Sequence, residues 1–401
     1  MGADGLCSQD AVAARRRLCG NAACRQHGDT VRLEPRSGDV AELIYPVAVL
    51  GGGIAGAAAA LRLAQGGVRP VWIAADRRGS FKPGEHLSAA AIPLLTTLGS
   101  ASVLRSEVHR HAHSTYSAWG SDILIERNAI VQLEGPPIVL DRAAFEDTLS
   151  ARAIASGAKR IVRDVMDVRI TDGHWQLDTG DECIEAGFVF DATGRKAVIA
   201  SKFSTRFQAD KLCCQYALLT SPNEQEPRPV TLIEAEERGW WYMSVLADQR
   251  VILNFYSDTD LPSFDSSEYE KNARGTKAIS TYLMDYGYDF CGHPRRITTN
   301  SSWIAPAIGA GWVAIGDASA AFDPLSSHGM TTALWSAIEA ADAFVAQDLQ
   351  RMQAYADAVA KGVQDYLIAK RTVYSRETRW KNSQFWARRQ TNVAKFAETS
   401  A

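Results

Sequence analysis

Runs of apolar positions begin at Tyr45 and predict an α/β protein. The apolar run Val47–Leu50 is followed by glycines, by helical spacing over Ala57–Gln65 and by a second apolar run, Val71–Ala74. Strand, helix and strand in this order are typical of the βαβ unit that opens a Rossmann-type fold. We therefore expect a parallel sheet at the start of the regular part of the chain.

Further along, the pattern changes between the periods of strands and of helices. Residues 139–155 indicate a strand or loop that leads into a helix, while Arg169–Asp178 and Cys183–Phe190 alternate like antiparallel strands. Thr171–His174 is the expected turn. Residues from about 211 to 255 are β-rich, which favours a second sheet, and Thr331–Tyr366 has helical spacing. The pattern predicts a parallel-sheet domain, an inserted mixed β-sheet domain and C-terminal helices.

Composition narrows the class of protein. The net charge of -3 over 401 residues gives no reason to expect nucleic acid or an anionic membrane as a partner. No apolar run approaches the roughly 18 residues of a membrane span, and the amino end lacks a secretory pattern. The seven cysteines form no CxxC pair, so we expect reduced thiols in a cytoplasmic protein without a metal site.

Residues 1–44 precede the first predicted strand and show no clear period. We interpret them as a disordered tail or an over-extended start of translation, with a targeting or partner-binding arm as the alternative.

The first glycine motif is Gly51-x-Gly53-x-x-Gly56, between an apolar strand and an alanine-rich helix. The first glycine permits a tight turn, the second lets the backbone approach a pyrophosphate, and the third allows close helix–strand packing. The phosphates would lie at the helix N-terminus. The expected dinucleotide contacts are Gly51, Gly53, Ile54, Ala55 and Gly56, with Asp76 as the acid that binds the adenosine ribose.

A second motif, Gly316-Asp317, follows another apolar strand, Gly311–Ile315. In FAD enzymes of this design the aspartate binds a ribityl hydroxyl, and a Pro-x-x-x-x-Gly element passes the isoalloxazine ring. The helix that begins near Gly329 would direct its positive end at that ring. The two motifs together predict one FAD-binding fold closed by distant segments, and the contacts expected here are Gly316, Asp317, Pro324, Ser327, Gly329 and Met330.

Two further segments make the chain resemble the FAD-dependent monooxygenase and tryptophan-halogenase superfamily. Lys82–Leu87 with the following Ala91–Gly99 is similar to its Gly-Glu-Ser segment, and Asp191–Arg195 is similar to its Asp-x-x-Gly motif. The resemblance covers roughly residues 45–390. Arg142, at the start of a predicted helix, is a further expected cofactor contact.

Within the superfamily the likeness is greatest to flavoproteins that modify a tryptophan during cysteine tryptophylquinone biogenesis. It rests on four segments that are similar in combination: Ser117–Ser121, Gly239–Tyr242, Asp323–Gly329 and Glu377–Arg389. The chain departs from the halogenase pattern, which has a tunnel lysine and a Trp-x-Trp-x-Ile-Pro signature. Residues 114–120 contain no lysine, and 239–245 read Gly-Trp-Trp-Tyr-Met-Ser-Val.

The candidate catalytic residues are Glu85 and His328, each within a segment that the resemblance places beside the flavin. Trp119, Trp240 and Trp241 are expected to hold a flat aromatic substrate by stacking. His109, His111 and His113 have alternate spacing but no accompanying carboxylate or cysteine, so we interpret them as a strand face or loop.

We assign residues 1–44 to the tail and 45–100, 139–200 and 295–345 to an FAD domain. Residues 101–138 and 201–294 form the substrate domain, and 346–401 a C-terminal helical region. The predicted activity is hydroxylation of an indole, tryptophan or phenol-like ring through a flavin C4a-hydroperoxide, in a small molecule or a peptide. The reductant would be NAD(P)H, directly or through a flavin reductase. The alternatives are a halogenase, an FAD-linked dehydrogenase, oxidase or reductase, and a flavoprotein that mainly escorts a partner polypeptide.

Overall fold

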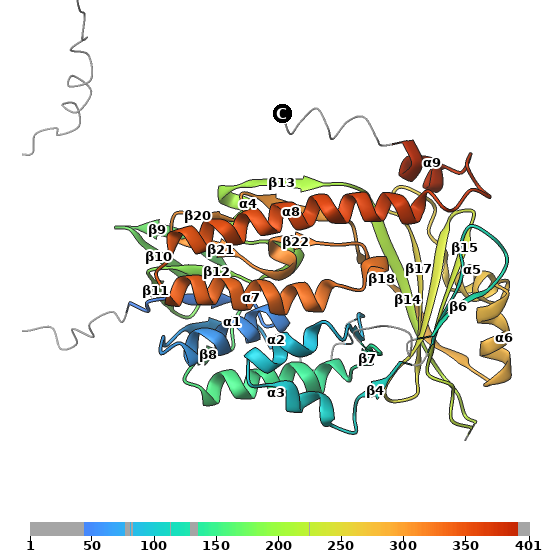
Figure 1. The fold of residues 1–401 in the computed structure, drawn as a ribbon, viewed down its shortest axis with the longest axis horizontal. Coiled ribbons are helices and arrows are strands. Elements are labelled where there is room, and N and C mark those ends of the chain that lie inside the picture. The colour runs from blue at the N-terminus through green and yellow to red at the C-terminus, as the bar shows by residue number, and fades with distance from the viewer. Residues whose placement is uncertain are drawn as a thin grey trace, which may run out of the picture. The chain divides into compact units, whose positions relative to one another are not determined.

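Two large sheets organise the part of the chain described by the computed structural model, residues 44–76, 81, 83–112, 114–128, 135–223 and 225–391 (Figure 1). The first has six strands, and all neighbours are parallel except the antiparallel pair at one edge. In spatial order its strands are β20 (Ile308–Gly309), β21 (Trp312–Ala314), β12 (Val189–Asp191), β1 (Ala48–Leu50), β2 (Val71–Ile73) and β8 (Lys159–Ile161). Segments far apart in sequence therefore end at one carboxyl edge of the sheet.

Different layers cover the two faces of this sheet. One face packs against α1 (Ile54–Gln65), α3 (Arg142–Ala155) and α7 (Gly329–Val345), whose alanine-rich apolar stripes lie in a shared core. The other face packs against the antiparallel strands β9 (Asp167–Thr171), β10 (His174–Asp178) and β11 (Cys183–Ala186). This confirms the predicted Rossmann-type part of the fold.

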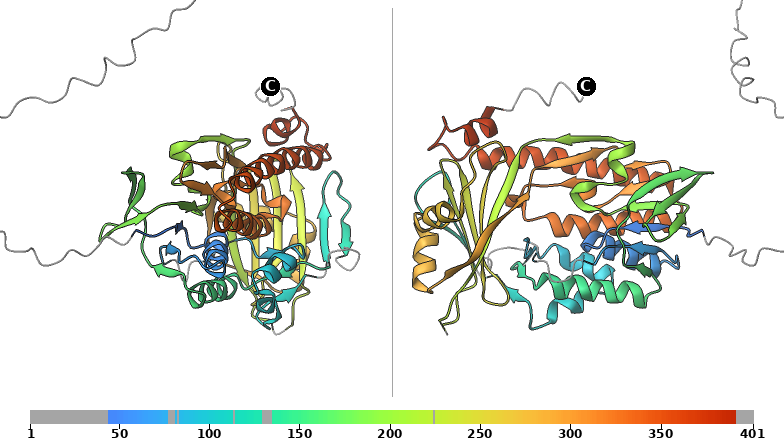
Figure 2. Two further views of the ribbon diagram at one scale, coloured as in Figure 1. Left: turned by 60° about the vertical axis from the view of Figure 1, so that its left-hand side comes forward. Right: turned by 180° about the vertical axis from the view of Figure 1, so that it is seen from behind.

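The second sheet has seven strands, antiparallel except for one parallel pair, β15 and β5. In spatial order they are β18 (Asp289–Thr298), β14 (Leu212–Thr220), β17 (Val251–Asp258), β16 (Gly239–Val245), β15 (Val230–Glu236), β5 (Ser114–Ala118) and β6 (Ile125–Asn128). One face is covered by α5 (Ser266–Arg274) and α6 (Ala278–Asp285), at the right in Figure 1. The opposite face is directed toward the ends of α7 and α8 (Leu349–Tyr374) (Figure 2).

Two small sheets and several short helices connect the large sheets. The first small sheet joins β3 (His86–Leu87), β7 (Ile138–Val139) and β4 (Arg110–His111), and the second joins β13 (Thr205–Gln208), β19 (Ser302–Ala305) and β22 (Ala320–Ala321). The short helices are α2 (Ala91–Thr97), α4 (Ala200–Phe203) and α9 (Gln384–Thr391). In the part of the chain that the structure describes, no helix combines the length and apolarity of a membrane span.

Two predicted elements are each divided in the structure. Cys183–Phe190 is not one strand: the chain crosses at Gly187 from β11 in the three-stranded sheet to β12 in the six-stranded sheet. Thr331–Tyr366 is not one helix either, because Gln347 has a left-handed φ of 54° and Asp348 caps a new helix by accepting a hydrogen bond from Arg351 N. The division into an FAD domain and a substrate domain stays a prediction, since both sheets lie in one compact unit.

Candidate active site

The turn after β1 requires glycine at two positions. Gly51 has φ +121°, and a Cβ there would lie 2.1 Å from the carbonyl oxygen of Ala192, which follows β12. A Cβ at Gly56 would lie 2.0 Å from the Gly51 carbonyl oxygen. The turn is therefore tight against the neighbouring strand, and α1 begins directly above the carboxyl edge of the sheet.

The second glycine motif lies in contact with the first. Gly316 follows β21 with φ +57°, and a Cβ there would come within 2.8 Å of the Ala55 Cβ at the start of α1. The Gly316 amide donates to the buried Ser336 hydroxyl at 2.8 Å, which ties the turn to α7. Two segments distant in sequence thus form one continuous surface, as a site closed by both motifs requires.

The N-termini of α1 and α7 have the properties of an anion-binding surface. The first amide groups of any helix have no partner within the helix. In α1 and α7 no described side chain caps these groups either. A Cβ at Gly53 or at Gly329 would meet nothing within 4 Å, so open space lies above both backbones. Ile54, Ala55 and Met330 are buried beneath these turns. Such ends favour phosphate or developing negative charge.

The predicted polar cofactor contacts lie on different sides of this surface. Asp76 is exposed, three residues after β2. Asp317 forms a 3.7 Å ion pair with Arg195, which also donates to the Phe322 carbonyl oxygen at 3.2 Å. Arg142 opens α3 and donates to the carbonyl oxygens of Pro83 at 2.8 Å and Gly84 at 3.1 Å. It therefore holds the segment that leads to Glu85.

The loop before α7 contains the remaining candidates. Asp323 is 1% exposed, and its side chain accepts from Leu325 N at 2.9 Å, which forms the short turn Pro324–Ser326. Ser327 then takes a left-handed φ of 52°. His328 is exposed at the N-cap position of α7, although its ring does not cap the helix.

Glu85 and His86 meet the second sheet through a buried polar cluster. The Tyr242 hydroxyl donates to Glu85 Oε1 at 3.0 Å, and Gly84 N donates to Glu85 Oε2 at 3.1 Å. His86 Nε2 lies 3.0 Å from the Ser244 hydroxyl, and its Nδ1 lies 3.4 Å from the Tyr242 hydroxyl. We call Glu85, His86, Tyr242 and Ser244 the Glu85 cluster. It joins the β3 segment to β16.

Burial sets the protonation states in the Glu85 cluster. Burial lowers the pKa of His86, and the nearby Glu85 charge only partly opposes this shift, so the imidazole is neutral at neutral pH. Burial and the Glu85 charge raise the pKa of Tyr242 well above its usual value. Tyr242 therefore stays a hydrogen-bond donor, and His86 can accept a proton.

The lowered pKa of His86 predicts a loss of stability in acid. The unfolded chain binds this proton below about pH 6.5, whereas the folded protein resists it until a lower pH, so the contribution of His86 to stability is present above pH 6.5 and is lost as the pH falls. We expect the melting temperature of His86→Gln to fall less than that of the unsubstituted protein between pH 7.5 and pH 5.5. His293→Gln, at an exposed site, should keep the original pH dependence. An unchanged pH dependence in His86→Gln would contradict the prediction.

The three candidate tryptophans do not lie together. Trp240 points to the same face of β16 as Tyr242 and packs edge-to-face with Trp119, with 6.1 Å between the ring centres. Trp241 points to the opposite face, where it is buried against Phe255 at 4.7 Å and under α5. Trp240 is fully buried and stacks on Tyr256 with 4.0 Å between the ring centres, so Trp240 and Trp241 both belong to the core, while Trp119 is partly exposed.

The C-terminal segment covers the face of the sheet that carries Trp240. Its aromatic residues Tyr374, Phe385 and Trp386 are buried in one cluster with Trp240, and Leu325 of the loop before α7 packs against that cluster. Ion pairs fix the segment: Arg389 binds Asp258 at 2.7 Å, and both side chains are at most 5% exposed. The loop, the sheet face and the C-terminal segment thus meet in one place.

Several polar residues in this region were not predicted from the sequence. Tyr242 and Ser244 are two of them, although alternation along β16 places them on the face of Trp240. Lys370 was also missed. It has a 10% exposed side chain, bound to Asp210 and lying 3.5 Å from Asp323, and it is the one lysine among the described residues that is not exposed. The spacing of Tyr366, Lys370 and Tyr374 at four-residue intervals could have indicated that Lys370 lies on one polar face of α8.

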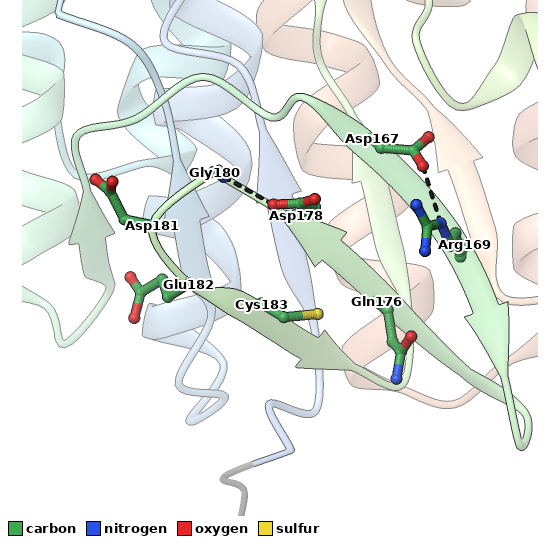
Figure 3. Close-up of a pocket in the computed structure, with 8 residues that line it drawn as sticks. All are labelled: Asp167, Arg169, Gln176, Asp178, Gly180, Asp181, Glu182 and Cys183. Atoms are coloured by element: carbon green, nitrogen blue, oxygen red, sulfur yellow. Dashed lines mark hydrogen bonds and ion pairs between the residues drawn. The ribbon is translucent and has the colours of Figure 1, made fainter.

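A surface hollow lies elsewhere. It is formed by β9, β10 and β11, and its lining includes Asp178 and the ion pair between Asp167 and Arg169 (Figure 3). Figure 1 shows these strands at the end of the six-stranded sheet away from the seven-stranded sheet. The hollow is therefore separate from the candidate active site.

The histidine triplet gives no metal site in the described residues. His109 Nδ1 accepts a hydrogen bond from Asp141 N at 3.1 Å, and His111 is exposed in β4, whereas His113 lies outside the described residues. No group of three possible metal ligands occurs in the ranges that the structure covers.

Comparisons with known proteins agree with this geometry. The fold is that of flavin-dependent halogenases and related FAD enzymes: QhpG, a peptidyl tryptophan dihydroxylase essential for tryptophylquinone cofactor biogenesis, superposes with a TM-score of 0.70. The two proteins share 22% identity, and the alignment covers 87% of this chain and 79% of QhpG. The chain belongs to the tryptophan halogenase family, whose profile matches residues 136–399.

Two curated relatives extend the comparison. LodB of Marinomonas mediterranea, which is named as an FAD-dependent oxidoreductase, is 28% identical over 365 residues, covering 86% of this chain and 96% of LodB. A 1H-pyrrole-2-carbonyl-(peptidyl-carrier protein) brominase of Pseudoalteromonas luteoviolacea is 22% identical, covering 75% of this chain and 77% of the relative. The family and LodB imply a flavin cofactor. The open space above Gly53 and Gly329 and the uncapped helix ends fit such a group.

Proposed function

We propose that this protein is an FAD-dependent monooxygenase that hydroxylates an electron-rich aromatic ring, an indole or a phenol. The observation that carries the proposal is the Glu85 cluster, buried on the sheet face that also carries Trp240 and packs against the loop before α7. It provides a carboxylate, a neutral imidazole and two hydroxyl groups beside an aromatic surface. FAD, held at Gly51–Gly56 and at Gly316–Met330, would supply activated oxygen when reduced.

The side chains have distinct proposed roles. Hydroxylation adds an oxygen atom to a ring carbon, and that carbon must then lose a proton. The neutral His86 ring can take up this proton at Nε2 through the Ser244 hydroxyl, which lies 3.0 Å from that nitrogen. Nδ1 faces the Tyr242 hydroxyl, whose own proton is donated to Glu85, and this contact fixes the orientation of the ring. Glu85 holds the Tyr242 hydroxyl in place, and the partly exposed Trp119, which is backed by Trp240, would position the substrate ring.

The C-terminal segment would exclude water from the reaction. Glu377 is fully buried and accepts from Gly120 N at 2.8 Å, so it joins the segment to the loop after β5. Trp386 donates to the Glu236 carbonyl oxygen at 2.8 Å and closes the neighbouring edge of the sheet face. Exclusion of water protects reactive oxygen from unproductive loss.

Halogenation is the second candidate, because the chain belongs to the tryptophan halogenase family. A halogenase of this kind needs a lysine with a free ammonium group near the substrate. Lys370 is bound by two carboxylates, and Lys211 is exposed and pairs with Asp260 at 2.9 Å. Lys82 lies outside the described residues. The pairing of Lys370 and Lys211 with carboxylates favours hydroxylation.

The names of the relatives support an aromatic substrate that can be attached to a larger molecule. QhpG is a peptidyl tryptophan dihydroxylase and the brominase acts on a carrier-bound pyrrole. We therefore include a tryptophan-bearing peptide beside a free aromatic molecule as a substrate of this protein. Electrons would come from NAD(P)H, directly or through a separate flavin reductase.

The test is the mass of the product. The protein would be loaded with FAD and reduced by NADH and a flavin reductase in air, with indole, phenol or N-acetyltryptophanamide as probes, with and without bromide. Gain of one oxygen atom, independent of bromide, is the expected result. A brominated product would support the second candidate, and a dehydrogenated product without added oxygen would contradict both.

Glu85→Gln provides the matched variant. We expect turnover to fall by about 100-fold, typical of a group that organises proton transfer, while FAD stays bound. Glu226→Gln is the control, because Glu226 is exposed and pairs with Arg110, which is not a member of the Glu85 cluster. Equal turnover in Glu85→Gln and Glu226→Gln would remove Glu85 from the mechanism.

A further inference from the structure

One face of α8 carries three polar side chains at intervals of four residues: Tyr366, Lys370 and Tyr374. Residues spaced in this way lie above one another on a helix. All three contact one residue, Asp323, which immediately precedes Pro324 in the loop before α7. We call these three side chains the α8 stripe.

The contacts hold both the backbone and the side chain of Asp323. Asp323 N donates to the Tyr366 hydroxyl at 2.9 Å, and the Tyr374 hydroxyl donates to Asp323 Oδ2 at 2.8 Å. Lys370 Nζ lies 3.5 Å from the same carboxylate oxygen. Asp323 is 1% exposed, so these partners stand in place of water.

The α8 stripe also binds two further segments of the chain, through Lys370. Lys370 pairs with Asp210, just before β14, and donates to the Ser301 hydroxyl at 2.9 Å. Burial alone would raise the pKa of Asp210, but the Lys370 ammonium and its hydrogen bond outweigh burial and lower it. Asp210 is therefore charged, and Lys370 joins two buried carboxylates.

Tyr374 connects the loop to the substrate-facing sheet. Its hydroxyl accepts a hydrogen bond from Trp240 Nε1 at 3.1 Å and donates one to Asp323 Oδ2. Its ring packs against Trp119 and Trp386, with ring centres 5.6 and 5.9 Å apart. One hydroxyl thus lies between Trp240 of the seven-stranded sheet and Asp323 of the candidate flavin loop.

We propose that Tyr366, Lys370 and Tyr374 are positioning residues that fix the loop 323–329 against the sheet face and so set the geometry of flavin relative to substrate. The inference rests on the proposed function, because that function assigns this loop to FAD. The stripe acts through Asp323 and the loop backbone rather than on the reacting atoms. Deleting one of its hydroxyl groups should therefore loosen the loop without disturbing the rest of the fold.

Amide hydrogen exchange measures this loosening directly. Full-length protein would be compared with Tyr374→Phe and Tyr366→Phe by mass spectrometry, without and with FAD. We expect peptides that contain 323–329 to exchange about tenfold faster in both variants without FAD, which corresponds to about 1.4 kcal/mol in opening free energy. The Kd for FAD, from flavin fluorescence, should rise by about tenfold as well.

Tyr269→Phe is the matched control. Tyr269 is fully buried, and its hydroxyl donates to the Leu253 carbonyl oxygen at 2.7 Å on the opposite face of the sheet. It should leave exchange at 323–329 and FAD affinity unchanged. Loop exchange at the original rate in both stripe variants, or equal acceleration in Tyr269→Phe, would overturn the inference.

The two proposals fail in different ways. If the unsubstituted protein binds no FAD, the proposed function is wrong, and with it the assignment of this loop to flavin. The positioning role alone is wrong if the unsubstituted protein, Tyr374→Phe and Tyr366→Phe all bind FAD with the same affinity and residues 323–329 exchange at the same rate in all three.

Discussion

Gly53→Ala is expected to weaken FAD binding strongly while leaving the fold intact. An added Cβ meets no protein atom within 4 Å, and the backbone at φ -86° and ψ -173° suits alanine. The methyl group would instead occupy the space through which a pyrophosphate approaches the backbone. We expect the Kd for FAD to rise at least about 100-fold, or nearly 3 kcal/mol, with an unchanged melting temperature of the FAD-free protein.

Gly362→Ala is the control for this substitution. Gly362 lies within α8, and a Cβ there also meets nothing within 4 Å. Alanine should stabilise the helix by about 0.5–1 kcal/mol and leave FAD affinity unchanged. If Gly53→Ala bound FAD as tightly as Gly362→Ala, the first glycine motif would not be the dinucleotide site.

Lys370→Met is expected to cause the largest loss of stability. Methionine has a similar length but no charge, so Asp210 and Asp323 would face each other without a cation in a site that is at most 10% exposed. Removal of one partner from a buried ion pair typically costs about 3–5 kcal/mol. Urea unfolding followed by tryptophan fluorescence would measure the change in the free energy of unfolding.

Lys361→Met separates burial from charge. Lys361 lies on the same helix and pairs with Asp365 at 2.6 Å, but both side chains are more than 60% exposed. An exposed pair of this kind contributes about 0.3–0.5 kcal/mol. A loss in Lys370→Met no greater than that in Lys361→Met would show that the buried charges are compensated in another way.

The general architecture could be predicted because its signals are local. The glycine turn between Val47–Leu50 and the helix that follows needs only neighbouring residues for recognition, and the structure confirms the parallel sheet above it. The predicted turn at Thr171–His174 is also confirmed, since it connects β9 to β10. Such patterns depend on backbone geometry that nearby residues determine.

The limits of prediction have physical causes as well. The sequence pattern along Cys183–Phe190 indicates one strand. Pairing with β10 assigns its first half to the three-stranded sheet, and pairing with β1 assigns its second half to the six-stranded sheet. Lys361 and Lys370 look alike in sequence, yet only Lys370 meets Asp210 and Asp323, which come from remote segments. The roles predicted for Glu85 and His328 at the active site stay predictions.

The position of the α8 stripe near the end of the chain has a consequence for synthesis. Both glycine motifs and the whole seven-stranded sheet precede α8 in the sequence, so they leave the ribosome before Tyr366, Lys370 and Tyr374 are available. Because chains begin to fold from the N-terminus during synthesis, Asp323 is synthesised before Tyr366, Lys370 and Tyr374 can contact it. On the proposed function, the loop 323–329 therefore reaches its final position against the sheet only after residues 366–374 have been synthesised and have packed against it.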